Sequence, residues 1–171
     1  MAQPIPQDLS HLMAVNVEYS VLICLGNTCS CAVNPAGFTA HVRRKHKVPK
    51  EVWEQVEQYV QACAFNEYDY ASIQLPADGL APQPIIPIVD GFVCKECLHK
   101  TRDHSNIRKH ANKAHNKKRV ADKDLFDAVK LQSWFWTGKE RYWVVDEGRQ
   151  AAQESRACRA ATCDVGELSG D

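Results

Sequence analysis

Residues 94–115 read CKECLHKTRDHSNIRKHANKAH, and the cysteines and histidines in this stretch decide how this part of the chain folds. Four of them follow the spacing C-x2-C-x12-H-x4-H, which is typical of a small zinc-binding unit made of two strands and a helix. A tight turn aims both thiolates at one point, and the two histidines share one face of the helix that follows. We therefore predict four ligands for one Zn²⁺ ion: Cys94, Cys97, His110 and His115.

The residues between these ligands agree with that fold. Phe92 and Ile107 fall where a small core needs apolar side chains, whereas Thr101 occupies a position where an aromatic residue is usual, so we expect a thin core. His99 and His104 do not fit the ligand spacing. We expect His99 in the hairpin and His104 at the start of the helix, facing away from the ion.

A second, looser copy of the pattern occupies residues 24–46, CLGNTCSCAVNPAGFTAHVRRKH. The spacing C-x4-C-x11-H-x4-H selects Cys24, Cys29, His41 and His46 as ligands. Cys31 competes with Cys29 for the second position, and spacing favours Cys29 because Cys31 would lengthen the first gap to six residues. Since forty-seven residues separate the two copies, they do not form a tandem array that follows a nucleic-acid groove.

Composition favours metal-bound thiolates over disulfides. The chain has 171 residues and eight cysteines, and its N-terminal region lacks the basic start and unbroken apolar run of a secretion signal. No stretch is long enough to span a membrane. We expect a reducing, intracellular setting, nuclear rather than cytoplasmic, in which metal supplies folding energy to units too small for a sufficient core.

The zero net charge hides blocks of opposite sign. Residues 95–120 carry nine basic and two acidic groups, whereas residues 51–94 carry seven acidic groups and no Lys or Arg. Basic helices can hold phosphates by releasing counterions. The acidic segment can equally neutralise the basic helices within one molecule.

Together with the two ligand patterns, the rest of the sequence predicts a small α+β fold with two ββα-type zinc-finger-like units. Residues 17–23 indicate a strand, 49–65 an amphipathic helix, and the four prolines of 76–90 a stiff linker. A short helix from about Asp122 and a β-hairpin in SWFWTGKERYWVV should follow. The predicted segments are an N-terminal segment (1–14), unit 1 (15–48), the helix (49–75), the linker (76–90), unit 2 (91–119), helix plus aromatic hairpin (120–147) and a disordered tail (148–171).

Two further features invite a functional interpretation. The large aromatic rings of residues 134–143 could stack single-stranded bases, but aromatic residues are ordinary strand formers, and we expect them to pack against the protein. Cys158 and Cys163 have ligand-like spacing but no second pair nearby, so we do not predict a metal site there.

Three stretches in order resemble the fungal family typified by the orsellinic acid cluster protein D: ICLGNTCSCAVNPAGFTAHVRRKHKVP, IPIVDGFVCKECLHKTRDHSNIRKHANKAH and VKLQSWFWTGKERYWVV. The resemblance covers roughly residues 15–146. It implies two divergent zinc-finger-like segments around an acidic helix and a Pro-rich linker, and it places the same eight ligands in them. The gap between Cys24 and Cys29 is longer than in the family, and the tail after Glu147 has no counterpart.

We expect a non-enzymatic, zinc-binding interaction module whose basic helices contact protein or nucleic acid, with no membrane or small-molecule partner. Four protein ligands leave no open position for a catalytic water. The alternative is a sequence-specific DNA-binding regulator, although one finger reads only about three base pairs. Asp103 could face a base or cap the helix, and we favour the cap. The candidate nucleic-acid contacts are Asn106, Arg108, Lys109 and Lys113.

Overall fold

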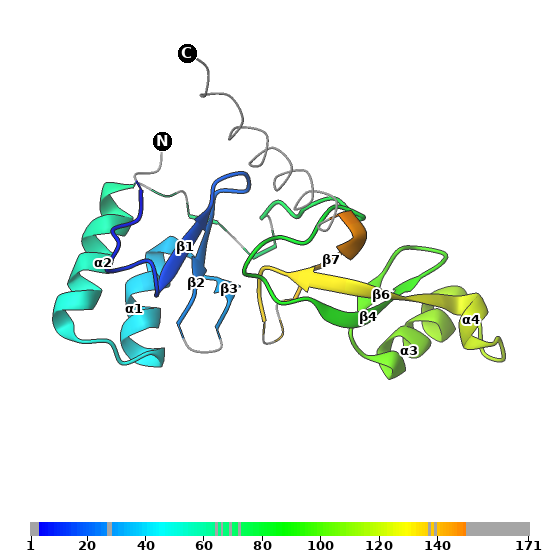
Figure 1. The fold of residues 1–171 in the computed structure, drawn as a ribbon. Coiled ribbons are helices and arrows are strands. Elements are labelled where there is room, and N and C mark those ends of the chain that lie inside the picture. The colour runs from blue at the N-terminus through cyan, green and yellow to red at the C-terminus, as the bar shows by residue number, and fades with distance from the viewer. Residues whose placement is uncertain are drawn as a thin grey trace, which may run out of the picture. The chain divides into compact units, whose positions relative to one another are not determined.

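The computed structural model of the protein describes residues 4–149, apart from residues 27, 28, 64, 66, 69, 72, 137 and 139. It is a small α+β fold with two sheets, shown in Figure 1. The chain divides into two compact units. The first unit comprises residues 1–76, 84–87 and 133–142, and the second comprises residues 77–83, 88–132 and 143–171.

The first unit contains a three-stranded antiparallel sheet of order β1-β2-β3. Its strands are β1 (Met13–Asn16), β2 (Val21–Cys24) and β3 (Cys31–Ala32). All four residues of β2, VLIC, are buried, which is why this apolar run forms the central strand.

The strand predicted at 17–23 starts later, at Val21, because the preceding residues form the turn from β1 to β2. Ser20 has a positive φ of 55°, and the Tyr19 amide donates to the Asn16 side-chain oxygen at 3.1 Å. Such side-chain bonds to the nearby backbone favour turns over strands. The prediction was therefore wrong for residues 17–20.

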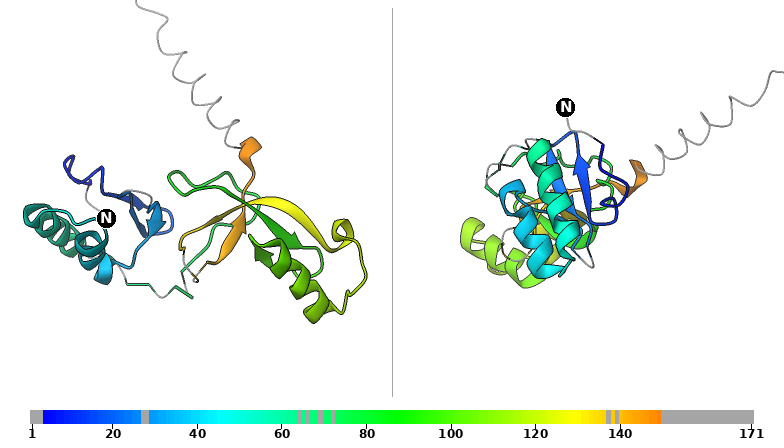
Figure 2. Two further views of the ribbon diagram at one scale, coloured as in Figure 1. Left: turned by 90° about the horizontal axis from the view of Figure 1, so that it is seen from below. Right: turned by 90° about the vertical axis from the view of Figure 1, so that its left-hand side faces the viewer.

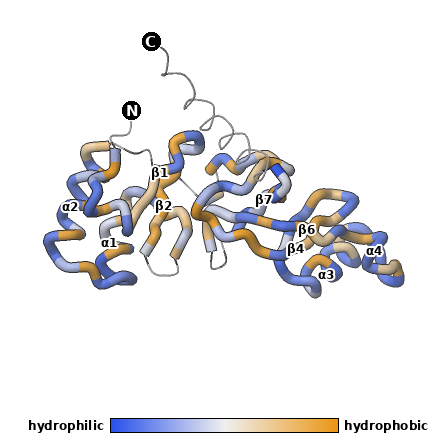
Figure 3. Tube along the Cα trace, in the orientation of Figure 1, coloured by the Kyte–Doolittle hydropathy of each residue, from blue (hydrophilic) through white to orange (hydrophobic). Residues whose placement is uncertain are grey.

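Two helices of the first unit lie side by side in Figures 1 and 2: α1 (Pro35–Lys45) and α2 (Lys50–Ala62). The Asn34 side chain caps α1 by accepting from the Ala36 amide. Hydrophilic and hydrophobic residues alternate along α2 in Figure 3, and Val56 and Tyr59 on its apolar face are buried. The predicted helix at 49–65 is thus found as α2, which ends three residues earlier than predicted, at Ala62.

The core of the first unit joins these helices to the sheet and to the aromatic run. Phe38, Val42 and Val56 are fully buried beside Leu22 of β2. Trp134 is also fully buried, where its backbone carbonyl accepts from the Ala32 amide at 2.7 Å. The large rings at 134–135 therefore pack inside the protein, as expected, and present no stacking platform.

The second unit is built on a four-stranded sheet of order β5-β4-β6-β7. Its strands are β4 (Val89–Cys94), β5 (Lys100–Thr101), β6 (Phe126–Ser133) and β7 (Tyr142–Val144). Two helices accompany it, α3 (His104–His115) and the single turn α4 (Asp122–Leu125).

The region after Asp122 differs from the prediction. The short helix ends at Leu125, and residues 126–133 form a long strand that was not expected. Six consecutive residues of this strand pair with β4, from Cys94↔Phe126 to Val89↔Leu131. Pairing with a distant strand decides this conformation, so local sequence could not show it. The predicted hairpin is shifted accordingly, because β6 ends at Ser133.

The Pro-rich stretch 76–90 is less of a spacer than predicted. Leu80 forms a parallel bridge with Val145, and the Gly79 amide donates to the Val144 carbonyl at 2.9 Å. The buried Gln132 side chain accepts from the Gln83 amide at 2.8 Å and donates to its carbonyl at 3.0 Å. Residues 77–83 therefore belong to the second unit.

Two further predictions concern the C-terminal tail and the lack of a membrane-spanning segment. The tail predicted as disordered lies outside the described residues from 150 onwards, and Cys158 and Cys163 lie there too. Among the helices that the described residues form, none has the length and apolar character needed to cross a membrane.

Candidate metal centre

Site 1, the set Cys24, Cys29, His41 and His46, lies in the first unit. Cys24 ends β2, Cys29 lies in the loop before β3, and the histidines lie on and just after α1. One ligand atom from each residue lies within 4.8 Å of all the others. The predicted choice of Cys29 over Cys31 thus agrees with the residues that the fold brings together.

Individual distances in site 1 suit a four-coordinate ion. Cys24 Sγ lies 3.2 Å from His46 Nε2, Cys29 Sγ lies 3.5 Å from His41 Nε2, and the two Nε2 atoms are 3.3 Å apart. A tetrahedral ion with usual bond lengths to N and S separates its donors by about 3.3–3.8 Å. The donors are therefore close to the positions that a bound ion requires.

Burial sets the protonation of site 1. Burial raises the pKa of the Cys24 thiol to about 12, although the Gly26 amide acts in the opposite direction. Burial, helped by the neighbouring His46, lowers the pKa of His41 to about 4. The imidazole is thus neutral and ready to bind at neutral pH, whereas an entering cation must displace the thiol proton.

Gly26 lies against the donor set in a way that excludes any side chain. A Cβ atom at this position would come within 2.7 Å of His46 Nδ1 and 2.8 Å of two carbons of the same ring. The sequence marks it only as a glycine between two candidate ligands. Its role follows from the close approach of the ring, which no local pattern reveals.

Site 2, the set Cys94, Cys97, His110 and His115, lies in the second unit. Cys94 ends β4, and both histidines lie on α3. His110 Nε2 and His115 Nε2 lie 3.0 and 3.2 Å from Cys97 Sγ, respectively. All four donors meet the same 4.8 Å criterion as site 1. The sequence-predicted sets are thus the sets that the fold assembles.

A carboxylate orients one imidazole of site 2. Glu96 Oε2 lies 3.3 Å from His115 Nδ1, and its other oxygen pairs with the Lys117 ammonium at 2.9 Å. The hydrogen bond from Lys117 is the main reason why the pKa of Glu96 lies below its usual value. A carboxylate on Nδ1 directs Nε2 to the ion. Sequence analysis missed Glu96, although its place between the two cysteines was a usable signal.

The two histidines that were not predicted as ligands, His99 and His104, lie where they were expected. His99 follows the cysteine turn and stacks on His110, with ring centroids 4.2 Å apart. Burial is the main reason why the pKa of His110 is lowered, and His99 adds to this effect. His104 begins α3, where its Nε2 lies 2.8 Å from an Asp122 oxygen. Neither belongs to a group of donors.

The core beside site 2 receives its aromatic side chain from outside the predicted unit. Phe126 of β6 packs edge-to-face on Phe92, with centroids 5.3 Å apart, and joins the buried Ile107. Thr101 is the strand partner of Phe92 and supplies no ring. The thin core predicted from Thr101 is therefore filled by a residue 25 positions further along the chain.

The candidate nucleic-acid contacts fall into two groups on α3. Asn106, Lys109 and Lys113 are exposed. Arg108 is half-buried and pairs with the Asp122 carboxylate. Asp103 caps the helix, since its carboxylate accepts from the Asn106 amide at 2.8 Å. The fold thus uses Arg108 and Asp103 for its own structure.

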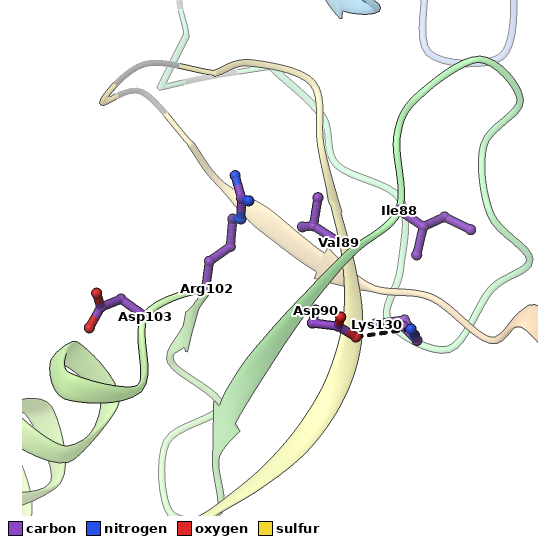
Figure 4. Close-up of a pocket in the computed structure, with 6 residues that line it drawn as sticks. All are labelled: Ile88, Val89, Asp90, Arg102, Asp103 and Lys130. Atoms are coloured by element: carbon purple, nitrogen blue, oxygen red, sulfur yellow. Dashed lines mark ion pairs between the residues drawn. The ribbon is translucent and has the colours of Figure 1, made fainter.

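A groove of about 550 Å³ lies near the start of α3, and Figure 4 shows the residues that line it. Asp90 of β4 and Lys130 of β6, which are cross-strand partners, form an ion pair on one side of it at 2.9 Å. Arg102 and the capping Asp103 extend from the other side. The groove therefore presents an ion pair and a helix cap, and no nucleophile beside a general base.

Comparison with known proteins identifies a family. The family model for the orsellinic acid/F9775 biosynthesis cluster protein D matches residues 11–116, which is more than half of the chain. No curated protein and no solved structure matches. The matched region contains all eight residues of sites 1 and 2 and ends directly after His115. The chain belongs to the family of orsellinic acid/F9775 biosynthesis cluster protein D.

Proposed function

We propose that the chain is a non-enzymatic zinc-binding protein in which two Cys₂His₂ sites hold two small units in shape for binding a partner. The observation that carries the proposal is the pair of donor sets, each with four ligand atoms within 4.8 Å of one another. Two such sets at the predicted spacing are unlike the scattered cysteines of an ordinary core.

The donor chemistry favours Zn²⁺ over other common cations. Two thiolates and two imidazoles suit a borderline-soft ion without geometric preference, whereas Mg²⁺ and Ca²⁺ take oxygen ligands. Two thiolates also balance the charge of one divalent ion. Four protein ligands complete the tetrahedron, which leaves no position for a water to be activated. These sites therefore suit a structural role.

The position of each site supports a role in folding. Each donor set joins the end of a central strand to a helix: β2 to α1 in the first unit, and β4 to α3 in the second. In the second unit, a metal ion at this point ties elements that share only a small core. Binding free energy then becomes folding free energy, so we expect removal of the metal to unfold both units.

Charge pairing within the second unit favours a protein partner. Four of the nine basic residues in 95–120 form ion pairs with carboxylates of the same unit: Lys95 with Asp127, Lys100 with Asp78, Arg108 with Asp122, and Lys117 with Glu96. Paired cations release fewer counterions from a phosphate backbone. Ion pairs within the fold therefore neutralise much of the positive charge that the sequence places in the second unit.

Nucleic acid remains the second candidate because one face of α3 keeps its charge exposed. Asn106, Lys109 and Lys113 are three to four residues apart, so they share a face, and all three are exposed. An asparagine can pair with adenine, and lysines can contact phosphates or guanine. A single helix of this kind supplies too little interface for sequence-specific binding alone.

Metal content tests the zinc proposal. We expect elemental analysis of the reduced, full-length chain to give about two zinc ions per chain, and about one after Cys94→Ser or Cys24→Ser. Reconstituted protein that retains less than about half an ion per chain would contradict the proposal.

Binding at two salt concentrations separates the partner classes. If α3 reads nucleic acid, Lys109→Ala combined with Lys113→Ala should weaken duplex binding and reduce its salt dependence by about two phosphate contacts. Lys130→Ala is the matched control, because Lys130 is paired with Asp90 on the sheet. Absence of duplex and single-strand binding at low salt supports the protein-partner proposal.

A further inference from the structure

One edge of β4 in the second unit is only partly paired. On one side, β6 pairs with β4 along its whole length, from Val89 to Cys94. On the other side, β5 pairs with Phe92 and Val93 alone. Among the strands that the described residues form, none lies beside residues 89–91 on the β5 side. The first half of β4 therefore has an open edge.

Hydrogen bonds at the end of β4 show which backbone groups face this open edge. The Cys94 amide donates to the His99 carbonyl at 2.9 Å, on the β5 side. The next amide, that of Lys95, donates to the Leu125 carbonyl at 3.1 Å, on the β6 side. Successive residues of an antiparallel strand direct their backbone groups to opposite sides. Counting back in steps of two from Cys94, the N–H and C=O of Asp90 face the open edge.

The edge stays open because the chain turns away from β4 directly after β5. The residue that a longer β5 would place opposite Asp90 is Asp103, given the register Phe92↔Thr101. The Asp103 amide instead donates to Thr101 Oγ1 at 3.2 Å, and its carbonyl accepts from the Ile107 amide at 3.1 Å as α3 begins. Within the part of the chain that the structure describes, no backbone group therefore pairs with Asp90 on this side.

The groove of about 550 Å³ in Figure 4 lies along this edge, and its charges indicate what it can hold. Ile88 and Val89, both half-buried, supply its apolar lining. The Asp90 side chain is 90% exposed, although its Oδ1 pairs with Lys130 on the β6 side. Opposite charges on neighbouring strands stabilise a sheet. A cation on the open side of Asp90 would therefore extend the row that Asp90 and Lys130 begin.

We propose that an extended segment of a partner protein adds to the open edge of β4 as a further strand, with a lysine or arginine opposite Asp90. The main-chain N–H and C=O of Asp90 bind the backbone of the segment, and its side chains supply the specificity. The exposed carboxylate attracts a basic peptide and repels the phosphates of nucleic acid. This inference rests on the protein partner of the proposed function and names the surface that binds it.

The probe is the capped pentapeptide acetyl-Thr-Val-Lys-Val-Thr-amide, which is extended by its β-branched residues and carries one central cation. The zinc-loaded, full-length chain, labelled with ¹⁵N, is titrated with this peptide, and amide NMR shifts and hydrogen exchange are followed. A second peptide has glutamate in place of the lysine. A third peptide is N-methylated at the lysine, so it keeps every side chain and loses the backbone donor that would bind the Asp90 carbonyl.

We expect the lysine peptide to bind with a Kd on the order of 1 mM and to slow exchange of the Asp90 amide by about tenfold at saturation. The glutamate and N-methyl peptides should each bind at least about tenfold more weakly. Asp90→Asn should remove the preference for lysine over glutamate. Asp127→Asn is the matched control, because Asp127 is also an exposed carboxylate of this sheet but pairs with Lys95 on β6, away from the open edge.

The zinc content of the same sample separates failure of the inference from failure of the proposed function. If the chain holds two zinc ions and the three peptides bind equally, or the lysine peptide does not bind at about 5 mM, strand addition at Asp90 is incorrect while the metal sites stand. The exposed carboxylate then only protects an edge strand from aggregation. Less than about half a zinc ion per chain, together with no peptide-induced shift of the Asp90 amide, would overturn both.

Discussion

Substitution of Gly26 tests the geometry of site 1 most directly. An alanine Cβ at this position would lie 2.7 Å from His46 Nδ1, whereas ordinary van der Waals contact begins near 3.4 Å. The ring must therefore retreat by about 0.7 Å, while metal–nitrogen bonds tolerate about 0.2 Å. Since φ of Gly26 is not in the left-handed region, the clash is the main cost of Gly26→Ala.

The expected result is a loss of metal affinity at one site only. Displacing His46 removes one of four donors, and even disturbing residues around a ligand costs 10–100-fold in affinity. We therefore expect Gly26→Ala to weaken site 1 by at least about 100-fold, or about 2.8 kcal/mol. Site 2 should keep its affinity, because its four donors come from the other unit.

Competition with a chromophoric chelator measures both affinities in one titration, and Gly37→Ala is the matched control. Gly37 lies within α1 of the same unit, and a Cβ there meets no atom within 4 Å. Alanine in a helix is more stable than glycine by about 0.5–1 kcal/mol, so this control should stabilise the unit slightly. If Gly26→Ala binds two ions with affinities within threefold of the unchanged chain, our description of site 1 is incorrect.

Three further predictions address the second unit. His110→Asn should abolish the amide NMR dispersion of this unit, whereas His104→Asn should preserve it; equal damage from both would contradict the ligand assignment. Glu96→Ala should speed metal loss from site 2 to a chelator by about 10–100-fold, without effect on site 1, because its imidazole loses an orienting partner. Gln132→Ala should lower the free energy of unfolding by about 1–3 kcal/mol in urea titrations, because it removes two hydrogen bonds between a buried side chain and the backbone of Gln83 in the Pro-rich segment; an unchanged midpoint would argue against these hydrogen bonds.

The ligand sets could be predicted because their geometry is local. Two histidines four or five residues apart on a helix face the same way in any fold, and two cysteines around a turn do likewise. The long gap between Cys29 and His41 adds only a short strand and the start of α1. The same reasoning placed Asp103 as a helix cap, because the carboxylate and the amide it binds are three residues apart.

The parts that could not be predicted depend on distant pairing. Residues 126–133 have no strict alternation of buried and exposed positions, yet they form β6 because β4 offers a complete edge for hydrogen bonding. Phe126 thereby reaches Phe92 and replaces the ring that Thr101 lacks. Only the three-dimensional arrangement shows that a unit with a deficient core is completed by a later strand.

The same pairing explains why a metal site alone does not define the second unit. Its ligands end at His115, and the family match ends one residue later, but its buried core includes Leu125 and Phe126. A thin core of local residues leaves the ion to supply much of the folding energy, whereas added apolar burial contributes about 25 cal/mol per Å² independently of the ion. The segment after the ligands therefore reduces how strongly this unit depends on metal. The first unit has a similar arrangement, because Leu9, Met13, Val56 and Tyr59, which lie outside its ligand segment, join Cys24 and Cys29 in its buried core. This core contains more buried apolar side chains than the core of the second unit, so more of its folding free energy is independent of the ion, and the second unit should be the more sensitive of the two to chelation.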